Sequence, residues 1–83
     1  MSKIQIAVVD SGWVLVGECH AGTKMVTLID ASVIRIWGTS KGLGEIALGG
    51  PTKTTQLDKV GTVFIERTSL KFLIACEDSK WLK

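Results

Sequence analysis

The chain has 83 residues, a formal net charge of +2 and a hydrophobic content of 46%. This length predicts one small domain spanning residues 1–83, with no room for a second, and the strand pattern described below indicates that it is β-barrel-like. The basic residues are dispersed among the acidic ones, which argues against the clustered positive charge of nucleic-acid-binding proteins. Because small domains bury a low fraction of their surface, we expect another copy of the chain to cover some of the apolar surface.

Localisation is indicated by what the chain lacks. It begins without the apolar segment and small-residue cleavage site of a secretory signal, and no apolar run approaches the roughly 18 residues of a membrane span. We therefore expect a cytoplasmic protein with no membrane partner. The spacing of Cys19 and Cys76 does not form a CxxC motif, so we expect two small buried side chains, with a disulfide as the alternative.

Four segments in the first half of the chain have the composition of β-strands. The turn signal Asp10-Ser11-Gly12 predicts that the first two form a hairpin. Gly17 within the second predicts a bend or a bulge. A break at Asp30-Ala31 is predicted to separate the third from the fourth. The four predicted strands span residues 4–9, 13–20, 24–29 and 32–37.

The periodicity then changes. Leu43, Ile46 and Ala47 recur at the spacing of a short helix, which we expect as an insert at about residues 40–50. Ser40 is the predicted N-cap, and the only proline of the chain ends the helix.

The remaining segments complete a mainly β fold. We expect a small, strongly bent antiparallel sheet or an SH3/Sm-like barrel of five to six strands with one short helical insert. The expected segments are a polar loop at residues 52–58, strands at 59–66 and 70–76, and a frayed polar end at 77–83.

Catalytic residues are not indicated by the pattern. His20 is the only histidine, and the carboxylates are scattered, so neither a metal-ligand set nor a positioned acid–base pair is predicted. The sequence favours a binding protein over an enzyme, with no cofactor and no metal.

Residues 35–51 are the strongest candidate for a functional site. They hold five of the nine glycines, the only proline and one of the three tryptophans. A glycine-rich turn that leaves a strand and opens a helix can hold an anion on its N–H groups. Thr39, Ser40, Lys41 and the adjacent backbone would hold phosphate, Arg35 would pair or stack, and Trp37 would provide an apolar wall. The predicted ligand-binding residues are Arg35, Trp37, Gly38, Thr39, Ser40, Lys41 and Gly42. The alternative is that these glycines only permit a tight turn and that Trp37 packs in the core.

The pattern R-I-W-G-T-x-x-G-L-G-x-I-A-x-G-G-P at residues 35–51 resembles a family of short, largely uncharacterised bacteriophage and prophage proteins. The resemblance extends from the N-terminal hairpin to the strand ending at Ala75-Cys76. It implies an anti-defence protein in the host cytoplasm, and no catalytic signature comes with it. We expect a homo-oligomer that sequesters a phosphorylated small molecule, such as a cyclic nucleotide immune signal. The alternatives are an anti-CRISPR-like inhibitor of a host defence complex or nuclease, and an Sm-like nucleic-acid-binding protein, which the mild charge makes the weaker candidate.

Overall fold

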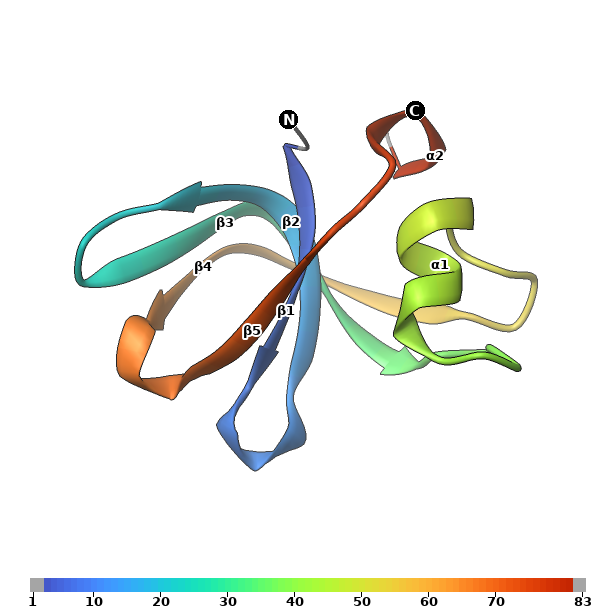
Figure 1. The fold of residues 1–83 in the computed structure, drawn as a ribbon, viewed down its shortest axis with the longest axis horizontal. Coiled ribbons are helices and arrows are strands. Elements are labelled where there is room, and N and C mark those ends of the chain that lie inside the picture. The colour runs from blue at the N-terminus through green and yellow to red at the C-terminus, as the bar shows by residue number, and fades with distance from the viewer. Residues whose placement is uncertain (1–2, 82–83) are drawn as a thin grey trace.

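Five antiparallel strands form one sheet in the computed structural model, which describes residues 3–81 (Figure 1). The strands are β1 (Ile4–Val9), β2 (Val14–Ala21), β3 (Met25–Ile36), β4 (Gln56–Glu66) and β5 (Leu70–Ala75). Their order is β4-β3-β2-β1-β5, so the first strand lies between the second and the last. The sheet is strongly bent but not closed, because β4 and β5 are its two edges. The predicted mainly β fold is confirmed in its bent-sheet form.

Short helical elements occupy the connections. They are η1 (Asp10–Gly12), α1 (Leu43–Gly49), η2 (Arg67–Ser69) and α2 (Asp78–Trp81), where η marks a 3₁₀ turn. The predicted helical insert is confirmed as α1. No helix in the described part of the chain has the length and apolar character needed to cross a membrane.

The core has two parts, one on each face of the sheet, because alternate residues of a strand point to opposite faces. The first lies between the sheet and α1 and includes three side chains of that helix: Ile4, Ile6, Val14, Val16, Ile34, Leu43, Ile46, Ala47 and Cys76. The second lies inside the bend of the sheet: Ala7, Val9, Leu15, Val26, Leu28, Ala31 and Ile65. Both faces of β1 are therefore buried. A slip of one residue in its register would move side chains of one core into the other, so packing specifies the register.

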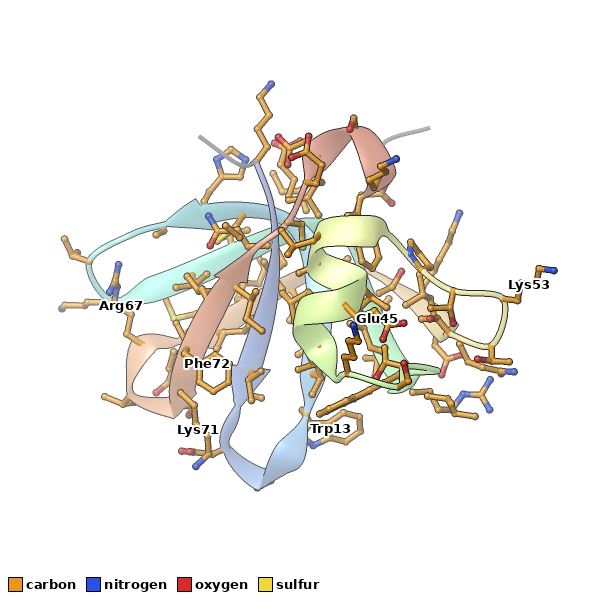
Figure 2. The ribbon with its side chains drawn as sticks, turned by 45° about the vertical axis from the view of Figure 1, so that its right-hand side comes forward. Trp13, Glu45, Lys53, Arg67, Lys71 and Phe72 are labelled. Atoms are coloured by element: carbon orange, nitrogen blue, oxygen red, sulfur yellow. The ribbon has the colours of Figure 1, made fainter. Side chains whose placement is uncertain are left out.

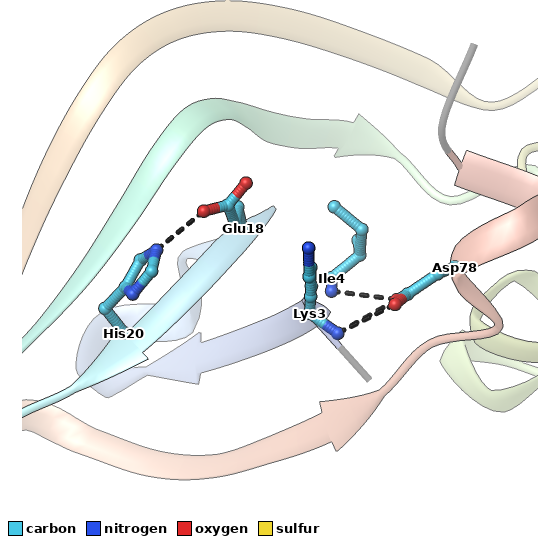
Figure 3. A network of polar contacts seen from close by, with 5 residues as sticks. All are labelled: Lys3, Ile4, Glu18, His20 and Asp78. Atoms are coloured by element: carbon cyan, nitrogen blue, oxygen red, sulfur yellow. Dashed lines mark hydrogen bonds and ion pairs between the residues drawn. The ribbon is translucent and has the colours of Figure 1, made fainter. Parts of the chain in front are cut away.

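The C-terminal segment is held against the start of β1 (Figure 3). The Asp78 carboxylate accepts hydrogen bonds from the backbone N–H groups of Lys3 and Ile4, each at 2.9 Å. These two bonds hold the pKa of Asp78 below its usual range. The indole N–H of Trp81 donates to the Ile46 carbonyl of α1 at 3.1 Å. The expected fraying of residues 77–83 is therefore wrong for residues 77–81, and residues 82 and 83 lie outside the described chain.

The predicted break between the third and fourth strands is wrong, because β3 is continuous from Met25 to Ile36. Asp30 has a φ of 53°, and the pairing register with both neighbouring strands shifts beside it, so the break is a bulge within one strand. Gly17 lies opposite this bulge. A Cβ there would lie 3.1 Å from the Ala31 Cα, so glycine allows β2 and β3 to approach closely and the predicted irregularity at Gly17 is confirmed.

The predicted polar loop at residues 52–58 is also too long. Gln56, Leu57 and Asp58 already belong to β4 and pair with β3. The side chain of Arg35 stabilises this pairing, because it reaches across from β3 to Gln56 and Asp58.

Candidate functional site

The insert between β3 and β4 is closed at its base by threonine hydroxyls. The hydroxyl of Thr55 donates to the Trp37 carbonyl and that of Thr52 to the Gly38 carbonyl, both at 2.7 Å. Gly38 has a φ of 65°, and a Cβ at this position would lie 2.5 Å from the Thr55 nitrogen and 2.6 Å from Thr54 Oγ1. Only glycine fits where the outgoing and returning chains come this close.

The glycine-rich turn already holds an anion, the carboxylate of Glu45. Glu45 Oε1 accepts from the backbone N–H of Ser40 at 3.1 Å, from that of Lys41 at 2.9 Å and from the Ser40 hydroxyl at 3.2 Å. Thr39 Oγ1 accepts from the backbone N–H of Gly42 at 3.1 Å. The backbone N–H groups of Ser40, Lys41 and Gly42 and the hydroxyl of Ser40 therefore already have acceptors within the chain.

The predicted Ser40 N-cap is wrong. The capping residue of α1 is Gly42, without a side-chain hydrogen bond. Ser40 lies two residues before the capping position, and its hydroxyl donates to Glu45 instead of accepting from the first turn of the helix. The Glu45 carboxylate reaches back from the first turn to the N–H groups of Ser40 and Lys41, and its negative charge is favourable at the helix start.

Arg35 and Trp37, predicted to act together on a ligand, make different contacts. Arg35 Nε lies 2.9 Å from Asp58 Oδ2, and an Arg35 terminal nitrogen donates to Gln56 Oε1 at 3.1 Å. The guanidinium therefore lies along β4 rather than over the glycine-rich turn. Trp37 remains 41% exposed at the end of β3, which contradicts simple core packing of this side chain.

A shallow, open concavity of about 700 Å³ lies on the insert. It brings together four of the predicted residues, whereas Arg35, Lys41 and Gly42 are not among those that line it. The lining residues are Trp37, Gly38, Thr39, Ser40, Glu45, Thr52, Lys53 and Thr54. Figure 2 shows Glu45 at the start of α1 and Lys53 at the far tip of the loop that leads to β4.

Sequence reasoning missed the contributions of Glu45, Thr52, Lys53 and Thr54. The signal is the run Thr52-Lys53-Thr54-Thr55 directly after Pro51, which the sequence predicts as part of a polar loop. These hydroxyls reach carbonyls that lie 14 to 18 positions earlier in the chain, a separation that no local motif indicates.

The histidine and the two cysteines do not line the concavity. His20 Nε2 lies 2.7 Å from Glu18 Oε2 on the exposed face of β2 (Figure 3). Within residues 3–81, no three or more His, Cys, Asp or Glu side chains are grouped as they would be to hold a metal ion. Cys19 and Cys76 are both free thiols. Burial, together with the nearby Asp78 charge, raises the pKa of Cys76 to about 11, and burial also raises that of Cys19, so neither thiol is activated as a nucleophile.

Comparison with known proteins identifies no family. No protein-family model matches the chain, and no curated protein has significant similarity to it.

Proposed function

We propose that this is a non-enzymatic binding protein of the bacteriophage type, which acts in the host cytoplasm as a homo-oligomer. Its ligand is a phosphorylated small molecule, such as a cyclic nucleotide immune signal, which it sequesters. The observation that carries this proposal is the concavity on the insert, where Trp37 and Lys53 lie among several hydroxyl groups. The resemblance of residues 35–51 to phage and prophage proteins supports the anti-defence role.

Each type of side chain has a distinct role in this proposal. The half-exposed indole of Trp37 offers an apolar plane on which a nucleobase can stack. Lys53 supplies a positive charge, and Thr39 supplies a hydroxyl donor. The hydroxyls of Ser40 and Thr54 already donate to Glu45 and to the Gly38 carbonyl, so they offer their oxygens as acceptors.

Phosphate binding at the glycine-rich turn is an exchange of anions. A phosphate can use the N–H groups of Ser40 and Lys41 only when the Glu45 carboxylate leaves them. The observed affinity is then lower than the intrinsic one by the cost of that displacement. If the Glu45 carboxylate is replaced by the neutral amide of glutamine, a phosphate should displace it more easily, because hydrogen bonds to charged groups are about twice as strong as neutral ones.

Calorimetric titration of the protein with cyclic and linear nucleotides tests the proposal. Glu45→Gln should bind the same nucleotide about tenfold more tightly, which corresponds to ~1.4 kcal/mol. Trp37→Ala should weaken binding, whereas Trp13→Ala is the matched control, because Trp13 is 58% exposed and does not line the concavity. Absence of heat for both wild type and Glu45→Gln at about 1 mM nucleotide would refute the phosphorylated ligand, because even that affinity corresponds to only ~4 kcal/mol.

A protein–protein inhibitor of a host defence complex or nuclease is the second candidate. The observation that favours it is the set of large apolar side chains that remain exposed on this small domain, which a protein partner could cover. They are Trp13, Met25, Ile29, Ile36, Trp37, Leu48, Leu57, Val60, Phe64 and Phe72. Recovery of one host protein in stoichiometric amount from lysate would support this function, and salt-sensitive retention on RNA or DNA would support the weaker nucleic-acid alternative.

A further inference from the structure

The outer edge of β4 is unpaired. β4 is hydrogen-bonded to β3 on one side, and in the described part of the chain no strand pairs with its other side. An exposed edge presents backbone N–H and C=O groups that can pair with another strand.

The ladder between β3 and β4 shows which residues of β4 direct these groups outward. The backbone N–H of Arg67 donates to the Lys24 carbonyl at 3.0 Å, one step beyond the last residue pair of the two strands. In an antiparallel ladder every second residue repeats this direction. Ile65 and Val63 therefore point their backbone groups toward β3.

The alternate residues Thr62, Phe64 and Glu66 direct their backbone groups away from the sheet. No lysine or proline interrupts this stretch. Directly before it, by contrast, Lys59 and the left-handed Gly61, with a φ of 81°, make the edge charged and irregular.

The other edge strand is less suited to pairing. The register between β1 and β5 shifts between Val8 and Val9, which leaves Lys71 of β5 without a partner in the ladder. A lysine and a bulge on an edge are two devices that prevent strand addition.

We propose that two copies of the chain pair antiparallel through residues 62–66 of β4, with Phe64 opposite Phe64 of the second copy across a two-fold axis. This deepens the homo-oligomeric part of the proposed function by assigning its interface. The pattern Thr-Val-Phe-Ile-Glu reads polar, apolar, aromatic, apolar, polar in both directions, so it is complementary to its own reverse. The outward-pointing residues of both copies then face one another, and Thr62 of each copy lies opposite Glu66 of the other.

The side chains favour a second copy as the occupant of this edge. Phe64 is 65% exposed, and an aromatic pair directly opposite across two strands stabilises the pairing. No like charges meet, because the only ionised side chain of the stretch, Glu66, faces a threonine. The short pairing predicts a weak dimer that forms at roughly 10–100 µM protein, as is usual for interfaces below ~1,200 Å².

Native mass spectrometry and sedimentation of charge variants test the register. Phe64→Lys and Phe64→Glu should each be monomeric, because like charges then lie directly opposite. An equimolar mixture of the two should form a heterodimer, since the opposed positions then carry opposite charges. Phe72→Lys is the matched control on β5, where a phenylalanine is similarly exposed at 52%, and it should leave the dimer intact.

A variant that dimerises more tightly than wild type cannot be explained by misfolding, so it tests the proposed register directly. Thr62→Lys places two new lysines opposite Glu66 and should tighten the dimer by roughly 2- to 30-fold, whereas Thr62→Glu should weaken it. Either variant that moves in the opposite direction, or a mixture of the position-64 variants that stays monomeric, would overturn this register.

The proposed interface and the proposed ligand can be refuted independently of each other. A wild-type protein that stays monomeric at about 100 µM while binding a nucleotide would overturn this inference and leave the ligand proposal standing. A dimer with the predicted variant behaviour that binds no nucleotide would support the interface and refute the ligand.

Discussion

Replacing Gly38 by alanine should destabilise the protein more than any other glycine-to-alanine change at the start of the insert. Gly38 combines a φ of 65° with backbone atoms of Thr54 and Thr55 within 2.6 Å of the added Cβ position. Those atoms cannot retreat without lengthening the hydrogen bond from the Thr55 hydroxyl to the Trp37 carbonyl.

The magnitude is the sum of two contributions. The left-handed backbone costs an alanine about 1–2 kcal/mol. Overpacking adds a further ~1–3 kcal/mol. We therefore expect the free energy of unfolding to fall by roughly 2–5 kcal/mol, a large fraction of what a small domain has.

Two further glycines separate these contributions in a urea denaturation series. Gly12 has a φ of 82° but open space around its added Cβ, so Gly12→Ala should show the backbone cost of about 1–2 kcal/mol alone. Gly44 lies in α1 with open space and an ordinary φ, so Gly44→Ala should stabilise the protein by about 0.5–1 kcal/mol. If Gly38→Ala lowers the unfolding free energy no more than Gly12→Ala at equal slopes of the denaturation curves, the close approach at Gly38 contributes nothing and the reasoning is refuted.

Three other variants or reactions test the rest of the structure. Because the pKa of Asp78 is lowered in the folded protein, its ionised form stabilises the fold above the ordinary pKa of 3.8. This stabilisation is lost as the pH falls through the folded-state pKa. The difference in urea midpoint between wild type and Asp78→Asn should therefore disappear on acidification. Cys19 should react with a thiol reagent in the folded protein well before Cys76, which is only 2% exposed, and equal rates would contradict this burial. Trp81→Phe removes the hydrogen bond to Ile46 and should lower the unfolding free energy by about 1 kcal/mol, as measured by urea denaturation. An unchanged midpoint would show that this bond does not hold α2 in place.

The strands could be predicted where a turn signal or an apolar alternation bounds them. Asp10-Ser11-Gly12 and the alternation around it correctly predicted the first hairpin. Asp30 is ambiguous in the sequence, because an aspartate with a left-handed φ occurs both in turns between strands and in bulges within one strand. Only pairing with strands on both sides, which is tertiary information, distinguishes the two.

The contacts of the candidate site were only partly predictable. Four of the seven residues that the sequence singles out, Trp37, Gly38, Thr39 and Ser40, line the concavity, and their role in ligand binding stays a prediction. The capture of the Ser40 and Lys41 N–H groups by Glu45 could have been expected, because an acidic residue in the first turn of a helix is a common capping partner. The ion pair of Arg35 with Asp58 was not predictable, because it requires β4 to begin earlier than its polar sequence indicates.

The central position of β1 has a consequence for synthesis on the ribosome. β1 emerges first, but one of its two neighbours is β5, and Asp78 binds the N–H groups at its start. The nascent chain can form the β1–β2 hairpin early, while the other side of β1 stays exposed until residues near 80 leave the exit tunnel. The pairing of β1 is therefore completed only after β5 has emerged, and a ribosome stalled within β4 would hold a chain in which one edge of β1 is available to chaperones or to other nascent chains.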